Sequence, residues 1–384
     1  MKNAGLQISR ILVGFLFIFS GLIKANDPLG FGYKLQEYFE VFHIAFLNDY
    51  ATAFAILLCT LEIILGALLL LGFWAEKVAW GLLILIIFFT FLTFYSAFFK
   101  VVTSCGCFGD AIPLTPWQSF SKDLILLVLI VIIFNQRARI VPLVQNSRAQ
   151  SIIFSVIVLF ALGFGLYTYN FLPVLDFLPY KVGNNIPQLM LSPPGAPQDV
   201  YQVTYTLKNK QTGETKEMTD KEYLKTEIWK DSKWEIIGEP VSKLMKKGYD
   251  VRIKDLKITD SQGTDYNKEI LENPYYNLII VAYDLTKADT RGIGDLNAIA
   301  INAAENFNIR TVLLTSNSAE DAEAFSNQNK LVMEVFYADG IPLKSMVRAN
   351  PGILLLKNGT VINKWHFHNL PSYDKLARTY FENN

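Results

Sequence analysis

The stretch "VAWGLLILIIFFTFLTFYSAFF" (78–99) holds 22 residues without a charged side chain. Because a helix needs roughly 20 apolar residues to cross the hydrocarbon core of a bilayer, this stretch alone predicts a membrane-spanning helix. Other long apolar segments lie at residues 8–25, 51–73, 119–135 and 151–172. The first half of the sequence therefore predicts a membrane α-helical bundle of about five transmembrane helices.

The first apolar segment is short between its charges, Arg10 and Lys24. Both side chains are long enough to snorkel, one to each membrane surface. No convincing small-residue cleavage site precedes Asp27, which favours a membrane span over a cleaved signal peptide. Residues 27–49 alternate aromatic and charged side chains, as a surface-lying helix does, and Asp27-Pro28 suits its first turn.

Charge divides the chain into a membrane half and a water-soluble half. Almost all of the apolar runs precede residue 173, and most charged residues follow residue 200. The 35 basic and 35 acidic side chains leave no net charge, so the composition argues against a nucleic-acid partner. The first partner that the sequence predicts is the lipid bilayer.

Positive charge near the ends of the spans predicts the orientation of the chain. The arginine-rich loop at residues 136–149 would share the cytoplasm with the N-terminus. Crossing an inner membrane about five times then places the C-terminal half in the periplasm. Cys105 and Cys107 would lie on that side too, in a compartment where disulfides persist.

A different pattern begins after residue 179. A linker rich in Pro, Gly and Asn (180–199) leads to a strand that turns at Gly213. Parallel crossovers, then an antiparallel hairpin with a tight turn at Asn358-Gly359, then a helix are the plan of an α/β thioredoxin-like domain. The expected elements are strands at 278–285, 310–316 and 331–338, helices at 295–308, 319–329 and 372–382, and a hairpin at 352–365.

The membrane half resembles the DoxX/MauE group, in which MauE is a methylamine utilisation membrane protein. The resemblance rests on "SRILVGFLFIFSGLIKANDPLGF" (9–31), "LEIILGALLLLG" (61–72) and, most specifically, "CGCFGDAIPLTPWQSFSKD" (105–123). It implies periplasmic electron or thiol transfer and, for MauE, the maturation of a disulfide-rich dehydrogenase subunit. With "LDFLPYKVGNNI" (175–186) and the C-terminal half included, the pattern resembles an uncharacterised DoxX-family group.

The C-terminal half resembles thioredoxin-like proteins of the TlpA/peroxiredoxin kind through "RANPGILLLKNGTVINKW" (348–365). The resemblance implies that Pro351 is a cis-proline whose loop could bind a partner chain, or that it serves the fold alone. The redox Cys-x-x-Cys should follow the first central strand, where this chain reads "DLTKADTRGIGD" (284–295). Because no cysteine follows residue 107, this domain cannot itself exchange thiols.

These patterns and resemblances divide the chain into four parts. We expect a DoxX/MauE-like four-helix membrane domain at 1–140 and a fifth transmembrane helix with its connection at 141–179. A linker with a small α+β extension follows at 180–250. The thioredoxin-like domain without Cys-x-x-Cys occupies 251–384.

Cys105 and Cys107 are the candidate redox pair. A disulfide between residues i and i+2 needs a bent backbone, which Gly106 permits, and its strained ring would be labile and oxidising. A reactive relay, a static disulfide and two packed thiols all fit this pattern. Lys122 opens the next helix and could lower a thiol pKa, or it could merely form a surface pair with Asp123.

Glu62 lies in the second span, where a charge is costly and often functional. A protonated Glu62 could bond a neighbouring helix. Alternatively, it could form a proton relay or a polar pocket near a quinone-like acceptor, so the cofactor is unknown and a quinone is one option. Cys59 lies on the same helix face and is expected to pack.

The metal-binding alternative is weak. His43 and Asp110 could help the two cysteines of the loop, but their spacing offers no complete set of ligands. His366 and His368 would share one face of a strand, and two histidines alone do not make a site. We therefore predict no metal site.

Two functions remain open. The first is a thiol or electron relay through the cysteine pair, in which the chain is an oxidoreductase component, its C-terminal domain docks a partner, and a periplasmic thiol protein is the client. The second is a non-enzymatic, membrane-anchored scaffold or interaction protein in which Cys-Gly-Cys only staples a loop. Free-thiol labelling with and without reductant discriminates between them.

Overall fold

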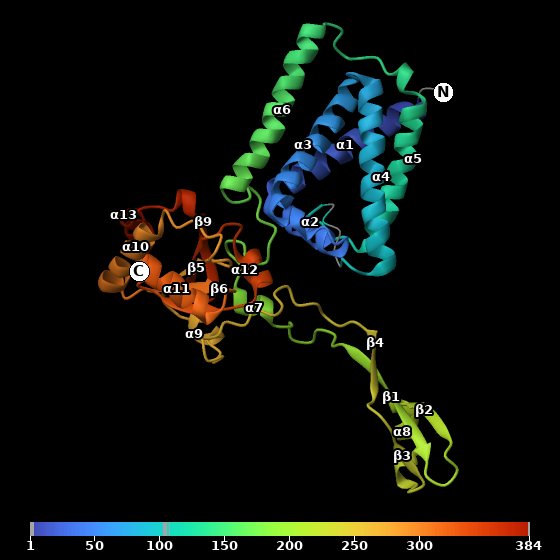
Figure 1. Cartoon of the computed structure of the whole chain (residues 1–384), viewed down its shortest axis with the longest axis vertical. Coiled ribbons are helices and arrows are strands. Elements are labelled where there is room, and N and C mark those ends of the chain that lie inside the picture. Colours follow the sequence, from blue (N-terminus) through green and yellow to red (C-terminus); the bar gives the residue numbers. More distant parts are fainter. Residues whose placement is uncertain (1–3, 103–105, 107, 383–384) are drawn as a thin grey trace. The chain divides into compact units, whose positions relative to one another are not determined.

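The computed structural model of the chain describes residues 4–102, 106 and 108–382. Its first half is a bundle of long helices (Figure 1). The described part of the chain holds five helices long and apolar enough to cross a membrane, which confirms the expected spans. They are α1 (Ala4–Asn26), α3 (Ala51–Leu71), α4 (Ala75–Phe99), α5 (Pro116–Asn135) and α6 (Ser147–Asn170).

Two helices of this half, α2 (Pro28–Val41) and α5, begin where the capping residues indicate. Helix α2 starts after Asp27, whose Oδ1 accepts the Gly30 N–H at 2.9 Å. Helix α5 starts with a reciprocal capping box between Thr115 and Gln118. These side chains satisfy N–H groups that a helix start leaves unpaired. The short 3₁₀ turn η1 (Ala45–Tyr50) leads from α2 into α3.

Helices α1 and α3 approach closely because glycines face one another. A Cβ on Gly66 would lie 2.7 Å from the Gly14 carbonyl oxygen, and one on Gly21 would lie 3.0 Å from the Cys59 carbonyl oxygen. Small residues allow helix backbones to pack this tightly inside a membrane. The close approach brings the polar side chains of α1 within reach of those on α3.

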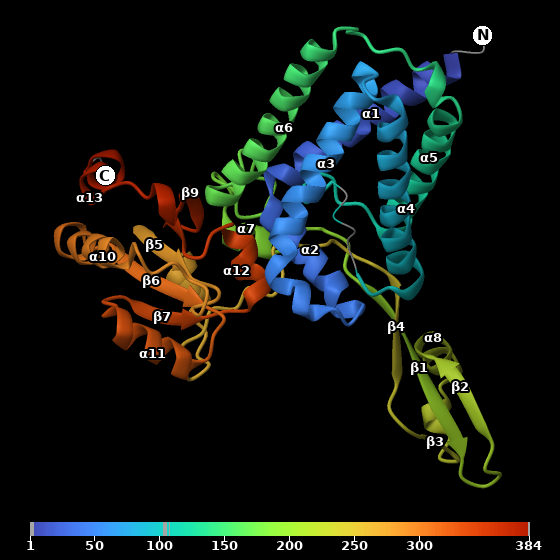
Figure 2. The ribbon, with the colours of Figure 1, turned by 45° about the horizontal axis from the view of Figure 1, so that its top comes forward.

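The C-terminal half contains the expected α/β domain. Its sheet has the order β7-β6-β5-β8-β9, with β5, β6 and β7 parallel and β8 and β9 antiparallel to their neighbours (Figure 2). The strands are β5 (Tyr276–Val281), β6 (Arg310–Thr315), β7 (Glu334–Tyr337), β8 (Gly352–Lys357) and β9 (Thr360–His366). The helices are α9 (Asn267–Leu271), α10 (Ile293–Phe307), α11 (Ala319–Asn329), α12 (Gly340–Met346) and α13 (Tyr373–Leu376).

Two details of this domain match the sequence-based expectations. Asn358 and Gly359 both have positive φ, as a tight primed turn requires. The Asn350–Pro351 bond is cis, as the resemblance implied. The helix expected at 372–382 is present as α13 continued by the π turn η5 (Ala377–Phe381), and an unpredicted 3₁₀ turn, η4 (Phe367–Asn369), precedes it.

Residues 185–256 form a separate compact unit, and the rest of the described chain forms the other. In the smaller unit β1 lies in the middle and pairs antiparallel with β2, β3 and β4. Gly213 has a φ of +75° in the turn between β1 and β2. The elements are α7 (Ile186–Met190), β1 (Val200–Asn209), β2 (Thr215–Thr219), α8 (Asp220–Thr226), η3 (Ile228–Lys230), β3 (Trp234–Ile236) and β4 (Val241–Lys246).

Candidate functional site

Glu62 forms a buried ion pair with Lys24, and the side chains of both residues are only 3% exposed. Lys24 therefore does not snorkel to the membrane surface as its position near the end of α1 suggested. Its ammonium also lies 5.0 Å from the centre of the Phe31 ring and 4.7 Å from that of Phe89. Glu62 Oε2 has no hydrogen-bond partner among the described residues, so one carboxylate oxygen is available for a further contact.

Arg10 also differs from the expectation of a snorkelling cation. Its guanidinium is buried and donates hydrogen bonds to the carbonyl oxygens of Leu69 and Leu70, at 3.2 and 3.3 Å. Those carbonyls belong to the last turn of α3, where a helix lacks internal donors and its dipole favours a cation. Arg10 therefore caps α3 instead of reaching a membrane surface.

A second ion pair lies at the start of α5. Lys122 Nζ is 2.6 Å from Asp123 Oδ1, and the Asp123 side chain is 1% exposed while that of Lys122 is 22% exposed. Thr93 from α4 donates its hydroxyl to Asp123 Oδ2 at 3.0 Å. The Lys122 ammonium also lies 5.3 Å from the centre of the Phe108 ring. The expected pairing exists within α5, but its Asp123 side chain is buried and bonds Thr93 of α4, so the pair is not a surface pair.

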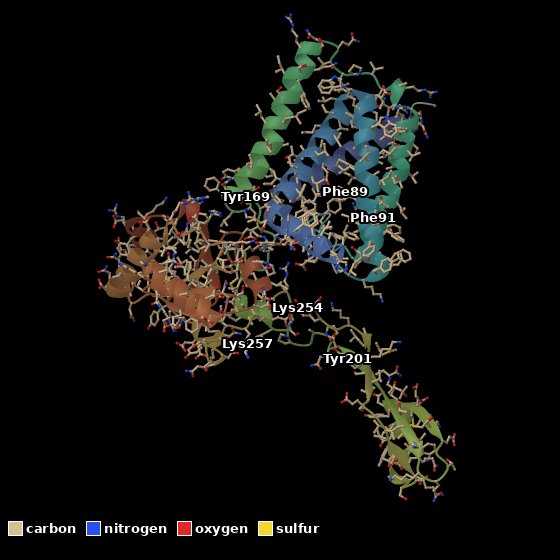
Figure 3. The ribbon with its side chains drawn as sticks, viewed as in Figure 1. Phe89, Phe91, Tyr169, Tyr201, Lys254 and Lys257 are labelled. Atoms are coloured by element: carbon tan, nitrogen blue, oxygen red, sulfur yellow. The ribbon has the colours of Figure 1, made fainter. Side chains whose placement is uncertain are left out.

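Both ion pairs line one small cavity inside the helical bundle. Its volume is about 40 Å³, and its wall includes Phe89 from α4 (Figure 3) and Phe108. A water molecule needs roughly 10–15 Å³ of such volume and two or more polar partners, so the cavity can hold a few waters. The structure therefore brings Glu62 and Lys122, two separately predicted residues, to one polar site in an apolar bundle.

Cys105 and Cys107 themselves lie outside the described residues, but their neighbours do not. Gly106 has a φ of +67°, the left-handed conformation that glycine adopts readily. Phe108, which follows Cys107, is buried against the cavity of the two ion pairs. Cys59 is fully buried in α3, one turn before Glu62, as expected of a packing residue.

A larger chamber of about 570 Å³ lies beside this cavity and shares Lys24 and Phe31 with it. Its walls come from α2, from the loop that contains Gly106 and Gly109, from residues 173–178 and from α12. Neither α12 nor this chamber was predicted, because the walls of the chamber come from four separate parts of the chain.

Arg348 is buried in the wall of the chamber and forms polar contacts with other segments of that wall. Its Nε lies 3.0 and 2.8 Å from the two carboxylate oxygens of Asp27, and its Nη2 is 3.4 Å from Asp110 Oδ2. Nη1 donates to the Lys344 carbonyl oxygen. Burial lowers the pKa of Arg348, but Asp27 and Tyr33 outweigh that effect and raise the pKa overall. The group therefore remains a cation in this position.

Neutral and charged contacts support the same wall. The Tyr33 hydroxyl donates to that of Tyr283 at 3.0 Å, and burial raises the pKa of both phenols, so both stay neutral at physiological pH. Lys364 Nζ lies 2.6 Å from Asp176, and burial lowers the pKa of this lysine. The contact between the α/β domain and the membrane domain thus contains buried polar groups with partners.

Pro351 is buried within the α/β domain and lines a void of about 10 Å³ among core residues such as Ile280 and Leu313. The preceding Asn350 donates its side-chain N–H to the Asp284 carbonyl at 2.7 Å and accepts the Asp289 N–H at 3.0 Å. The segment in which a Cys-x-x-Cys motif was sought is therefore tied to the proline loop.

The rings of His366 and His368 have centres 4.6 Å apart and are tilted by 33°. They do not share a strand face as expected, because β9 ends at His366 and His368 lies in the turn η4. His366 Nδ1 accepts the backbone N–H of His368 at 3.2 Å, and burial lowers the pKa of His366 to about 4. Within residues 4–102, 106 and 108–382, no three His, Cys, Asp or Glu side chains gather as a metal site.

Sequence reasoning missed Lys24 and Arg348 as site residues. The Lys24 pairing could have been predicted from the sequence, because Lys24 and Glu62 carry opposite charges in two predicted spans and could neutralise each other. The contacts of Arg348 could not have been predicted, because its partners Asp27 and Asp110 are more than 200 positions away in the chain.

Comparison with known proteins gives two matches. Residues 2–136 match the family model described as methylamine utilisation protein MauE. A protein named Protein TlpB from Flavobacterium psychrophilum is 32% identical over 130 residues, which cover 33% of this chain and 35% of that protein. The chain thus spans about a third of the length of this curated relative. The first part of the chain is a MauE-type membrane domain, and the chain is a multi-pass membrane protein.

Proposed function

We propose that this chain is an inner-membrane thiol relay, in which Cys105 and Cys107 exchange with a periplasmic client and are then reoxidised. One observation carries the proposal. Glu62 and Lys122 line a single buried cavity, and Phe108, the neighbour of Cys107, forms part of its wall. Buried ionisable groups inside a membrane are expensive to maintain and usually functional.

The relay has two steps in which atoms and electrons balance. First, a client thiolate attacks the Cys105–Cys107 disulfide, and a mixed disulfide forms as the bond between the two cysteines breaks. The second client thiol then displaces the relay, so that the client gains one disulfide and the relay holds two thiols. Second, these thiols lose two electrons and two protons to a lipid-soluble acceptor, for which a quinone is the candidate class.

The buried cavity supports the second step. Oxidation of two thiols releases two protons, and the unpaired oxygen of Glu62 with a few waters can accept and pass them on. A lipid-facing groove of about 530 Å³ shares Lys122 with the cavity, and its apolar wall includes Leu12, Leu16 and Trp117. An acceptor dissolved in the bilayer can reach Lys122 by this route.

The α/β domain contributes no thiol, since no cysteine follows residue 107. We assign it the docking of a partner beside the cysteine loop. Arg348 of this domain bonds Asp110, three residues after Cys107, so the domain lies next to that loop.

The test is differential alkylation of thiols in membranes. Wild-type protein should contain both reduced and oxidised Cys105/Cys107, and the ratio should shift when a client thiol is supplied. Replacing either cysteine by serine should abolish client oxidation while membrane insertion remains normal. Cys59→Ala is the matched control and should retain activity, because that thiol is fully buried.

The result that would overturn the proposal is full activity of the Cys105→Ser/Cys107→Ser double variant. A permanently oxidised pair that no client reduces would have the same meaning. In either case Cys-Gly-Cys has only a structural role in the loop, and the chain is the non-enzymatic scaffold of the alternative hypothesis.

A further inference from the structure

The chamber beside the cysteine loop carries an inference of its own about the substrate. Gly106, between the two cysteines, and Gly109 both line it. A molecule in the chamber can therefore contact the backbone at Gly106 and Gly109. Because the chamber holds about 570 Å³, it has room for much more than a single thiol group.

The mouth of the chamber is apolar although it lies outside the membrane spans. Lining side chains from three different segments remain exposed: Ile341 by 77%, Leu175 by 57%, Ile112 by 43% and Phe177 by 39%. Large apolar side chains exposed around an opening mark a surface that binds another protein, a ligand or a membrane. A small polar thiol would gain nothing from them.

The charges inside the chamber also favour a polypeptide over a small anionic ligand. The Arg348 donors already serve Asp27, Asp110 and the Lys344 carbonyl, so no open guanidinium edge awaits an anionic metabolite. Lys34 is paired with Glu37 at 2.6 Å in the same wall. Lys344 in the same wall lies 4.9 Å from the centre of the Tyr33 ring. A lining in which most cations contact carboxylates or aromatic rings, with aliphatic groups between them, suits a polypeptide, which brings backbone amides and mixed side chains.

We propose that the chamber binds an extended polypeptide segment of the client, with apolar side chains on both sides of a cysteine. The apolar residues contact the mouth, and the cysteine reaches the loop at Gly106. The inference rests on the proposed relay function and names its substrate as protein thiols instead of small thiols. Arg348 and α12 complete the site, so the α/β domain is part of the substrate pocket.

The experiment uses two variants of the full chain in lipid nanodiscs, and each keeps a single cysteine. The first carries Cys59→Ala and Cys107→Ser and keeps Cys105. The second carries Cys59→Ala and Cys105→Ser and keeps Cys107. The first probe is a short peptide with leucines around one cysteine, activated as a mixed disulfide with thionitrobenzoate. The protein thiolate attacks the peptide sulfur, the bond to thionitrobenzoate breaks, and the coloured thiolate leaves. The second probe is the small disulfide dithiobis(nitrobenzoate).

The chamber is tested by Ile341→Asp/Leu175→Asp, which places charges on two exposed positions of the mouth. Losing two apolar contacts should slow the peptide reaction about tenfold or more while the small disulfide reacts as before. Val174→Asp is the matched control, since Val174 is 60% exposed and next to Leu175 but is not part of the chamber wall. It should leave both rates unchanged.

Two outcomes contradict the inference in distinguishable ways. If the small disulfide reacts and the mouth variant leaves the peptide rate unchanged, the relay stands but its substrate is not a chamber-bound polypeptide. If neither probe reacts with either single-cysteine protein, the relay itself is wrong and the inference falls with it. A change in both rates would show that the variant disturbs the loop, and it too counts against the chamber.

Discussion

Lys24 and Glu62 show how a single charged residue affects the stability of a membrane bundle. Separately, each would be a charge that the hydrocarbon interior disfavours by several kcal/mol. Together, with the rings of Phe31 and Phe89 over the ammonium, they form a pair that the bundle retains. Because a neutral apolar pair would be at least as stable, stability alone does not account for these charges. The relay proposed at this cavity would account for them.

The first prediction concerns this pair. Glu62→Gln leaves Lys24 as an unpaired buried cation, and Lys24→Met leaves the carboxylate, so each should lower the free energy of unfolding by about 3–5 kcal/mol. The double variant Lys24→Met/Glu62→Gln removes both charges and should recover most of that loss. Thermal unfolding in detergent measures all three. Additive losses in the double variant would show that the two groups do not form the pair.

A second prediction follows from His366, whose folded-state pKa is lowered to about 4 by burial. The unfolded state binds the proton more readily, so stability is complete above pH 6.5 and is lost as the pH falls toward 4. The loss should be roughly 3 kcal/mol, because one pKa unit corresponds to about 1.4 kcal/mol. His368 and Asp289 are the charged neighbours of the ring, and only the first adds to the lowering.

The measurement compares unfolding of wild type and His366→Gln across this pH range. The variant should show a clearly flatter pH dependence of its free energy of unfolding, since glutamine does not titrate. Parallel curves for the two proteins would assign the acid sensitivity to other groups.

At the scale of elements, composition predicted the spans because length and apolarity suffice to define a helix in lipid. The strand and helix order of the α/β domain was predictable as well, since buried strands such as β5 (Tyr276–Val281) are short, continuous apolar runs. Helix α12 (Gly340–Met346) was missed, because seven residues with a proline lack a readable period. The chamber was missed with it.

The capping box of α5 gives the third prediction. Thr115 accepts the Gln118 N–H through its hydroxyl oxygen, and the Gln118 side chain accepts the Thr115 N–H, so Thr115→Ala leaves the Gln118 N–H without its partner. Stability should fall by about 1 kcal/mol. Hydrogen exchange of the Gln118 amide should also accelerate. Thr115→Ser keeps the accepting oxygen and should behave as wild type, and equal exchange in the alanine variant would contradict the role of the cap.

At the scale of the whole molecule, Arg348 joins parts that are distant in sequence. Its carboxylate partners are the N-cap of α2 and Asp110 of the cysteine loop, so the α/β domain, a membrane-surface helix and the candidate redox loop share one buried cation. No pattern within a single segment encodes such a contact, which is why sequence reasoning found the domains but not their meeting point.

The fourth prediction tests this connection. Arg348→Met leaves Asp27 without its guanidinium partner and should cost about 3 kcal/mol of stability. Asp27→Asn removes the charge yet keeps an oxygen that can cap α2, so adding it to Arg348→Met should restore part of the loss. Thermal unfolding of the full chain measures each protein. A double variant less stable than both single variants would argue that the residues act independently.

The fifth prediction concerns the orientation of the chain in the membrane. It rests on the distribution of positive charge between the two ends of the bundle. The start of α1, the end of α3 and the loop after α5 meet at one end of the bundle, since Arg10 bonds Leu69 and the Leu143 N–H bonds the Leu71 carbonyl. Arg139 and Arg148 are exposed there. At the other end Lys100 is exposed, but three lysines are paired with acidic side chains, namely Lys24 with Glu62, Lys34 with Glu37 and Lys122 with Asp123.

Free positive charge is thus concentrated at the end that holds the N-terminus, which the positive-inside rule assigns to the cytoplasm. A phosphatase that is active only in the periplasm should therefore be active when fused after Asn384, while the same fusion after Asn146 should be inactive. A fluorescent protein that matures only in the cytoplasm should give the reverse pattern. Fluorescence from the Asn384 fusion would place the cysteine loop in the reducing cytoplasm, where a stable disulfide relay is not expected.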